Sequence, residues 1–248
     1  RPRNSLTTPG LFSGTVLSAN TAVPAVTMQT RPNITLHLIL GIRCYLNSMA
    51  PKNKSNIINP FSYWVVDRSI AAGEYPGRQF SFNLMTNLAT LIHSVRAMFI
   101  ADGVFLNSAS FKIGSLLDNG IRTFVDLTEE GERPNYRNVL LKERRKRALE
   151  CKYFRFPIQD KRVPTKDQMT AVIDLVRSEV ESGRPVYIHC FRGLGRTGLA
   201  VGCLIQEYGP GSENPLIDLQ NLRGGLAGDF RTSPETETQK EFVLDWLK

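Results

Sequence analysis

The sequence predicts an α/β fold with a mostly parallel central sheet flanked by helices. Short apolar runs alternate along the chain with longer stretches of helical periodicity, a pattern typical of strand–helix–strand units. The longest helical stretch has a start signal, because Thr165 and Gln168 have capping-box spacing, and a stop signal at Gly183. The apolar run 186–188 then leads directly into a glycine-rich loop. In a parallel sheet, such a loop lies at the carboxyl ends of the strands, where active sites are found.

The expected elements follow one another closely from about residue 60 onward. Strands are expected at 63–66, 70–73, 122–127, 153–156 and 186–188, each a short apolar run. Helices are expected at 84–99, 111–119, 138–150, 165–183 and 197–208, and in a last segment that ends near Trp246. In the helix that begins at Thr165, the apolar side chains share one face: Met169, Val172, Ile173, Val176 and Val180.

The first 58 residues differ in composition from the remainder. They are rich in Thr, Ser, Asn and Pro, and no Asp or Glu precedes Asp67. We expect a disordered N-terminal extension over residues 1–58 and a folded domain over residues 59–248. One interpretation of the extension is an organelle transit segment, which is typically basic and poor in acidic residues. The other is an unstructured extension, with Met49 as a plausible natural start.

The overall charge and the cysteines limit the classes of function. The net charge is +8, but six basic residues of the extension account for most of it, so nucleic-acid binding is not expected. The four cysteines show neither zinc spacing nor a disulfide framework. They indicate a reducing, cytoplasmic location, and no metal or cofactor is expected. No apolar run reaches the roughly 18 residues that a membrane-spanning helix needs.

The glycine-rich loop joins the run 186–188 to a helix and has the composition of a phosphate-binding site. Cys190 and Arg196 are separated by Phe191, Arg192, Gly193, Leu194 and Gly195. Glycines allow successive backbone N–H groups to point inward, and the following helix adds partial positive charge at the same place. Arg196 can donate two parallel hydrogen bonds to a tetrahedral oxyanion. This electropositive field favours the thiolate of Cys190, which is the nucleophilic form of cysteine.

The segment His189-Cys190-Phe191-Arg192-Gly193-Leu194-Gly195-Arg196-Thr197-Gly198 resembles the signature loop of the protein-tyrosine and dual-specificity phosphatase superfamily. The similarity is greatest to small bacterial-type and atypical dual-specificity members, and it covers residues 61–77 and 111–247. The resemblance implies the cysteine phosphatase fold and a phosphocysteine intermediate on Cys190. It further implies that Arg196 binds the phosphoryl group, that Thr197 hydrogen-bonds the cysteine sulfur, and that His189 orients the loop. A phosphatase of this kind would be independent of metals.

An acid is needed to protonate the leaving oxygen. Asp160 lies thirty residues before Cys190, at the end of an expected strand, and resembles the acid of the family's mobile loop. Asp167 is the alternative, although a place in the first helical turn explains it equally well. Gln239 is comparable to a family glutamine that positions water, and a plain helix-surface role remains open for it. Glu74 and Asp126 are expected to hydrogen-bond loop backbone.

One segment departs from the family pattern, and the substrate remains open. Residues 78–110 form an atypical insertion that could be a lid, a partner surface or foreign sequence. The expected substrates are phosphotyrosine proteins, with or without phosphoserine and phosphothreonine, or a small phosphomonoester. The alternatives are a phosphoinositide, inositol phosphate or RNA 5′ phosphatase, and a non-catalytic phosphate-binding module. A basic cluster is formed by Arg144, Arg145, Lys146 and Arg147. It is either a solvated helix face or a surface that gives a preference for acidic or polyphosphorylated substrates. The oligomeric state is not indicated.

Overall fold

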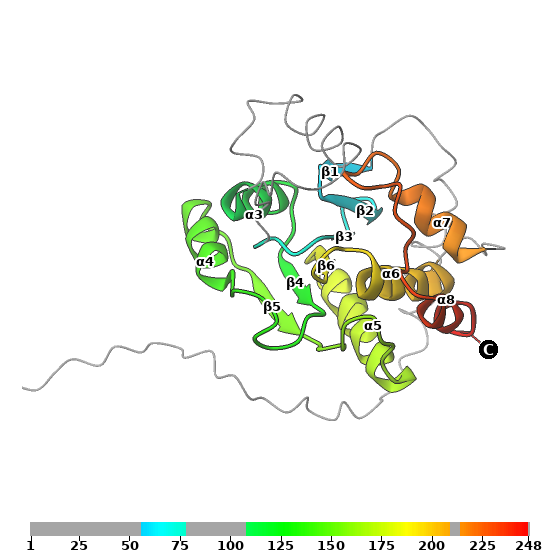
Figure 1. The fold of residues 1–248 in the computed structure, drawn as a ribbon. Helices are drawn as coiled ribbons and strands as arrows, with labels where there is room; N and C mark the ends of the chain where they lie inside the picture. The colour runs from blue at the N-terminus through cyan, green and yellow to red at the C-terminus, as the bar shows by residue number, and fades with distance from the viewer. Residues whose placement is uncertain (1–55, 78–107, 209–213, 248) are drawn as a thin grey trace, which may run out of the picture.

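The central feature of the fold is a six-stranded sheet with strand order β1-β2-β3-β6-β4-β5 (Figure 1). The computed structural model describes residues 56–77, 108–208 and 214–247. The strands are β1 Ile57–Asn59, β2 Ser62–Val66, β3 Ile70–Gly73, β4 Thr123–Asp126, β5 Lys152–Arg155 and β6 Val186–His189. Strands β3, β6, β4 and β5 run parallel, whereas β1, β2 and β3 pair antiparallel. The predicted α/β fold with a mostly parallel sheet is therefore confirmed.

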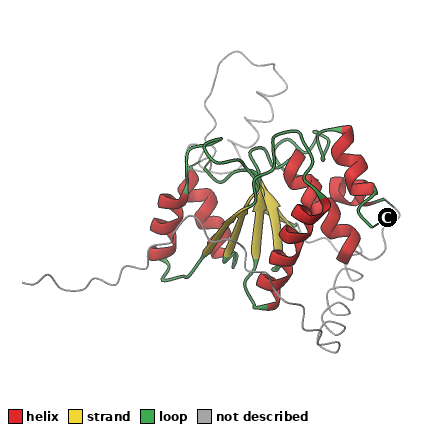
Figure 2. Ribbon diagram, turned by 90° about the horizontal axis from the view of Figure 1, so that it is seen from below, coloured by secondary structure: helices red, strands yellow, loops and turns green. Residues whose placement is uncertain are grey.

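Helices cover both faces of this sheet (Figure 2). They are α3 Ala109–Asp118, α4 Arg137–Lys146, α5 Lys166–Glu181, α6 Gly195–Tyr208, α7 Pro215–Leu222 and α8 Glu237–Leu244. Helices α3 and α4 pack together on one face, and their apolar side chains share one core cluster. Helices α5 and α6 lie on the opposite face, where α7 and α8 pack against α6. The result is a three-layer arrangement typical of α/β domains.

The central strands are apolar on both faces because both faces are covered. On β4, Phe124 belongs to the core cluster with α3 and α4, whereas Val125 belongs to the cluster with α5 and α6. On β6, Tyr187 and Ile188 divide between the two clusters in the same way. Successive strand side chains point to opposite faces, so a strand buried on both sides reads as a continuous apolar run.

The helix signals of the sequence have their expected structures. The Thr165 side chain accepts a hydrogen bond from the Gln168 backbone N–H, and the Gln168 side chain binds the Thr165 backbone in return, which completes the capping box of α5. Gly183 follows the end of α5 with a φ of +72°, a conformation that residues with a Cβ rarely adopt. Gly120 follows α3 with a φ of +94°. Local sequence therefore determines where these helices begin and end.

Several element boundaries differ from the expectation. Strand β1 was not predicted, and it includes two residues, Ile57 and Ile58, that were assigned to the extension. Helix α7 was not predicted either, although Asn214 caps it and Pro215 occupies its first turn. The helix expected at 138–150 ends at Lys146, and Ala148 beyond it has a φ of +52°.

Two predicted regions lie largely outside the described residues. These are the N-terminal extension up to residue 55 and residues 78–107 of the insertion, which include the helix expected at 84–99. Within the ranges that the structure describes, no helix has the length and apolar character needed to cross a membrane.

Candidate active site

The carboxyl ends of the parallel strands meet at one edge of the sheet, where connecting loops gather (Figure 2). The last residues of β3, β6, β4 and β5 are register partners, namely Gly73, His189, Asp126 and Arg155. Cys190 follows β6 immediately and is 2% exposed. The predicted loop therefore occupies the position at which α/β sheets bind ligands.

The loop curls tightly because two glycines meet. Gly193 has a φ of +68°, and a Cβ there would lie 2.5 Å from the Gly73 carbonyl carbon and 2.8 Å from the Glu74 nitrogen. A hydrogen bond from the Tyr75 N–H to the Phe191 carbonyl, 3.1 Å long, joins the same two segments. The turn after β3 thus supports the loop from one side, and this close approach requires glycine.

Arg196 lies in the first turn of α6 and is almost fully buried, at 1% exposure. Its Nη1 and Nη2 donate to the two carboxylate oxygens of Glu132, each at 2.7 Å. Nη1 also donates to the Ile158 carbonyl at 3.0 Å. Burial by itself would lower the pKa of this guanidinium, but the hydrogen bonds to Glu132 and the surrounding negative charges raise it. Arg196 is therefore a fixed cation beside Cys190.

Asp160, the predicted acid, lies beside this arginine. Its Oδ1 is 3.1 Å from Nη2 of Arg196, and its side chain is 61% exposed. The carboxyl group comes from the loop after β5, where it is both near Arg196 and open to solvent. The alternative, Asp167, lies in the first turn of α5 as expected from capping.

His189 is completely buried below the loop. Its Nε2 lies 2.7 Å from the Tyr136 hydroxyl, and its Nδ1 lies 3.9 Å from Asp126 Oδ1. Burial lowers the pKa of this imidazole, although the charge of Asp126 acts in the opposite direction. His189 is thus neutral at pH 7. This geometry fits a role in orienting the loop.

Asp126 and Glu74 bind different groups. Asp126 accepts hydrogen bonds from the Thr128 backbone N–H at 2.9 Å and from the Tyr153 hydroxyl at 2.6 Å, so its predicted bond to loop backbone is present. Burial disfavours its ionised form, but the electrostatic interaction with the nearby His189 ring and these hydrogen bonds outweigh burial and lower its pKa. Glu74 forms a buried ion pair of 2.5 Å with Lys112 of α3, and its expected bond to loop backbone stays a prediction. That pair anchors the turn after β3 to α3.

The C-terminal segment packs behind the loop, as the family resemblance implies. The Ser233 hydroxyl donates to the Leu194 carbonyl at 2.8 Å. Gln239 is fully buried in the first turn of α8, where its side-chain oxygen accepts from the Thr236 N–H and its nitrogen donates to the Arg162 carbonyl at 3.1 Å. Its amide therefore links α8 to the loop that carries Asp160. A role of Gln239 in water positioning stays a prediction.

The remaining loop residues divide between the interior and the rim. Leu194 and Thr197 are buried. The Thr197 hydroxyl has no hydrogen-bond partner among the described residues, so its expected hydrogen bond to the Cys190 sulfur is not formed in this structure. Phe191 and Arg192 lie toward solvent, and the Arg133 guanidinium stacks 3.4 Å from the Phe191 ring centroid.

Three residues of this site were not identified from the sequence: Glu132, Arg133 and Tyr136. All three lie in the segment that follows β4. Asp126 marked the carboxyl end of that strand, and polar residues just beyond such an end are signals for a site in a parallel sheet. The acidic and basic residues in Glu-Glu-Gly-Glu-Arg (129–133) could have been identified in this way.

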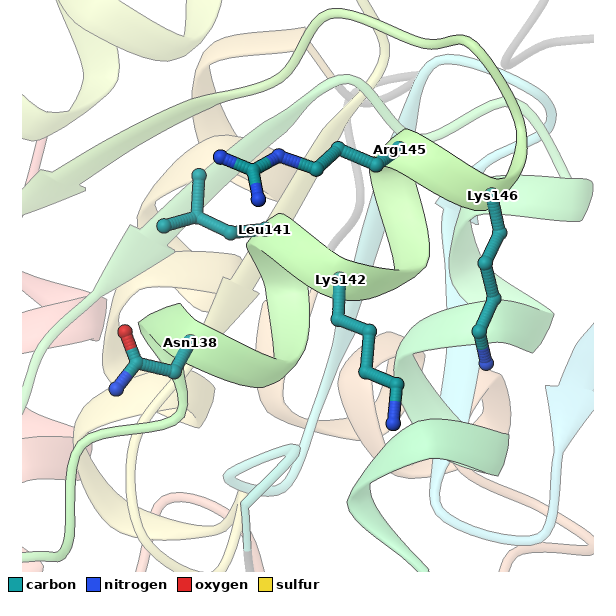
Figure 3. Close-up of a pocket in the computed structure, with 5 residues that line it drawn as sticks. All are labelled: Asn138, Leu141, Lys142, Arg145 and Lys146. Atoms are coloured by element: carbon teal, nitrogen blue, oxygen red, sulfur yellow. The ribbon is translucent and has the colours of Figure 1, made fainter.

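One surface hollow among the described residues lies along α4 and includes no residue of this loop. It has a volume of about 660 Å³ and is lined along α4 by Asn138, Leu141, Lys142, Arg145 and Lys146 (Figure 3). Its lining offers no nucleophile or acid. Within the described parts of the chain, no group of three or more His, Cys, Asp or Glu side chains is arranged to hold a metal ion.

Comparisons with known proteins agree with this geometry. The family described as "Tc-R-P: Polymorphic toxin system, DSP-PTPase phosphatase" matches residues 106–209. An uncharacterised protein of Methanocaldococcus jannaschii is 35% identical over 92 residues, which cover 37% of this chain and 57% of the relative. A protein of Invertebrate iridescent virus 3, whose name provisionally assigns it as a tyrosine phosphatase, is 29% identical over 159 residues. That match covers 59% of this chain and 63% of the viral protein.

Among solved structures, the active form of Tk-PTP shares 20% identity with a TM-score of 0.49, covering 76% of this chain and 96% of that one. The chain spans little more than half of the length of the curated relatives that it matches. The matched residues 106–209 include β4, the segment around Asp160 and the complete loop from His189 to Gly198. Over this region, the chain is similar to the DSP-PTPase phosphatase family that this model describes.

Proposed function

We propose that this protein hydrolyses phosphomonoesters through a phosphocysteine intermediate on Cys190. The observation that carries the proposal is the arrangement around Arg196. This guanidinium is buried in the first turn of α6, beside the loop of Cys190, and contacts Asp160 at 3.1 Å. This arrangement supports the roles of Cys190 as nucleophile, Arg196 as anion clamp and Asp160 as acid, which hydrolysis of a phosphomonoester requires.

In the first step, the Cys190 thiolate attacks phosphorus, so that an S–P bond forms as the ester P–O bond breaks. The protonated carboxyl of Asp160 gives its proton to the departing oxygen, and the alcohol or phenol leaves neutral. The partial positive charge at the N-terminus of α6 and the Arg196 guanidinium stabilise the equatorial oxygens of the transferring group.

In the second step, water attacks the phosphocysteine. The Asp160 carboxylate takes a proton from the water, an O–P bond forms, and the S–P bond breaks to regenerate the thiolate and inorganic phosphate. His189, buried and neutral, holds the end of β6 in place through its contact with Tyr136 during both steps.

Substrate binding requires a rearrangement at Arg196. Its Nη1 and Nη2 atoms already contact Glu132, Asp160 and the Ile158 carbonyl. Its Nε has no hydrogen-bond partner among the described residues. A phosphoryl group can bind the Nε–Nη2 edge in bidentate fashion once Asp160 moves away from Nη2. The half-exposed position of Asp160 is compatible with that movement, which also brings it toward the leaving oxygen.

The substrates proposed first are phosphotyrosine proteins, with or without phosphoserine and phosphothreonine. Family members that act on inositol lipids tend to carry lysines in the loop, and this loop has none. The segment 59–248 is proposed as the phosphatase domain. A phosphoinositide, inositol phosphate or RNA 5′ substrate would use the same chemistry, and it remains the second candidate.

Hydrolysis of p-nitrophenyl phosphate in the presence of EDTA tests the proposal. We expect activity in the wild type and none in Cys190→Ser, together with ³²P label on acid-quenched wild-type protein from a labelled substrate. Equal activity in both proteins, or no activity in folded wild type, would refute the cysteine mechanism.

A further inference from the structure

Two arginines lie around a single aromatic ring next to the nucleophile. The Arg133 guanidinium carbon is 3.4 Å from the Phe191 ring centroid, and that of Arg192 is 5.9 Å from the same centroid. Phe191 directly follows Cys190 and is held by the hydrogen bond that its carbonyl accepts from the Tyr75 N–H. The two cations are therefore fixed at the rim of the phosphate-binding loop.

Both guanidinium groups are accessible to a ligand. The Arg192 side chain is 49% exposed, and its nearest carboxylate oxygen, on Glu235, is 3.7 Å away, which is longer than a hydrogen bond. Arg133 is exposed and takes part in no ion pair among the described residues. The adjacent acid, Glu132, has both oxygens bound to Arg196. The rim thus has two positive charges that are balanced only in part, through the loose ion pair of Arg192 with Glu235.

Stacking on an aromatic face leaves the donors of an arginine available. The planar guanidinium of Arg133 covers the ring with its face, so its N–H groups point outward along its edges. Those edges match the geometry of a phosphate or carboxylate, which arginine binds through two parallel hydrogen bonds. The stack also restricts the side chain before any ligand arrives, which reduces the entropy lost on binding.

The basic cluster of α4 offers a weaker alternative. Arg147 is bound to Asp118 and Glu143, and Arg144 is paired with Glu150. Helix α4 connects two parallel strands and runs opposite to them, so its last turn lies at the edge of the sheet away from Cys190. The hollow along α4 (Figure 3) contains Lys142 and Arg145, and all five of its lining residues come from α4 rather than from the catalytic loop.

We propose that Arg133 and Arg192 form a second anion subsite beside Cys190. The subsite selects substrates that carry a further phosphate or carboxylate next to the phosphomonoester that is hydrolysed. This inference rests on the proposed function, because it identifies the substrate class of the same site. The second anion can come from an adjacent phosphorylated residue of a peptide or from a small polyphosphorylated alcohol.

Substrate pairs that differ only in the second anion provide the test. We would measure kcat/KM for a phosphotyrosine peptide with neutral neighbours, for the same peptide with an adjacent second phosphotyrosine, and for p-nitrophenyl phosphate. An inositol bisphosphate and a monophosphate form the small-molecule pair. The variants are Arg133→Gln and, as a matched control on exposed α4, Arg145→Gln. If the wild type distinguishes the two peptides, the second anion comes from a peptide. If it distinguishes the two inositol phosphates, the second anion comes from a small molecule.

We expect the wild type to prefer the doubly charged member of one pair. Arg133→Gln should reduce that preference about tenfold, mainly through KM, since one bidentate contact is lost. Arg145→Gln should leave the preference unchanged. The subsite would be overturned if Arg133→Gln kept the wild-type preference. It would also be overturned if the wild type had equal kcat/KM for the two members of each pair.

Binding to Cys190→Ser protein separates this inference from the proposed function. Calorimetric titration with the same ligand pairs compares Cys190→Ser with the double variant Cys190→Ser/Arg133→Gln. It measures binding to the subsite without turnover. A tenfold weaker binding of the doubly charged ligand in the double variant supports the subsite even if the wild type fails to hydrolyse any substrate. Equal binding of both pair members by both proteins contradicts it even if hydrolysis proceeds.

Discussion

Glu132 holds Arg196 through two parallel hydrogen bonds of 2.7 Å, although the two residues are 64 positions apart in the chain. The carboxylate occupies the Nη1–Nη2 edge of the guanidinium and leaves Nε without a partner among the described residues. The hydrogen bond to Arg196 lowers the pKa of Glu132, so this acid is ionised throughout the neutral range. Glu132 therefore directs the remaining edge of Arg196 toward the position of a bound phosphoryl group.

This relationship predicts that Glu132→Gln impairs catalysis without preventing folding. An amide keeps one acceptor and loses the other, so Arg196 becomes less well oriented. We expect kcat/KM for p-nitrophenyl phosphate to fall about 10- to 100-fold, the range caused by misplacement of a binding group. Glu130→Gln, an exposed neighbour, serves as the control and should retain wild-type activity. Higher activity in Glu132→Gln would show instead that this carboxylate competes with the substrate.

A second prediction concerns the close approach of Gly193 to Gly73. Gly193→Ala combines an unfavourable φ of +68° with a Cβ 2.5 Å from backbone, whereas Gly120→Ala has a φ of +94° and no atom within 4 Å. Gly120→Ala should therefore lower the free energy of unfolding by only about 1–2 kcal/mol, which is the backbone term. Gly193→Ala should lose more stability and also its phosphatase activity. Thermal melts and p-nitrophenyl phosphate assays measure both effects, and equal losses in the two variants would contradict the steric argument.

The sequence predicted those features that depend on neighbouring residues. The capping box of Thr165 and Gln168 requires only three positions of the chain, and the loop from Cys190 to Arg196 is contiguous. The position of Asp160 near Arg196 could be predicted because it follows a strand, whereas its role as the acid stays a prediction. The contact of Glu132 with Arg196 and the stack of Arg133 on Phe191 could not be predicted, because each depends on how two distant loops fold over the same sheet edge. The ion pair of Glu74 with Lys112 could not be predicted for the same reason, since Lys112 comes from a helix 38 positions further along the chain.

Acid stability should depend on Glu179 of α5. This buried carboxylate accepts hydrogen bonds from Thr123, Lys152 and Arg184. Burial opposes its ionisation, but these hydrogen bonds outweigh burial and lower its pKa from 4.5 to about 2. A lowered folded-state pKa stabilises the protein above the unfolded-state pKa, and this stabilisation is lost as the pH falls through the folded-state value. We expect Glu179→Gln to lower the free energy of unfolding at pH 7 by about 1–3 kcal/mol.

Urea titrations at several pH values measure this difference. The difference in the free energy of unfolding between wild type and Glu179→Gln should reach its full size above pH 4.5. It should become smaller as the pH approaches 2. Glu150→Gln is the matched control. Glu150 also forms an ion pair, with Arg144, but its side chain is 95% exposed. That variant should change stability little at any pH, as exposed pairs generally do. A gap that stays constant between pH 7 and pH 2 would show that the charge of Glu179 has no part in it.

The assignment of the general acid makes the last prediction. Asp160→Asn retains the size and polarity of the side chain but removes the proton that the leaving oxygen needs. For a phenyl phosphate with a poor leaving group, kcat should fall about 10²–10⁴-fold, and the decline of the rate at high pH should disappear. Asp167→Asn, seven residues further along in the first turn of α5, should retain both the rate and the pH profile. Because a good leaving group needs little protonation, the defect of Asp160→Asn should shrink with an activated aryl phosphate. A defect of equal size for both leaving groups would mean that Asp160 acts on Arg196 through their 3.1 Å contact and does not supply the proton.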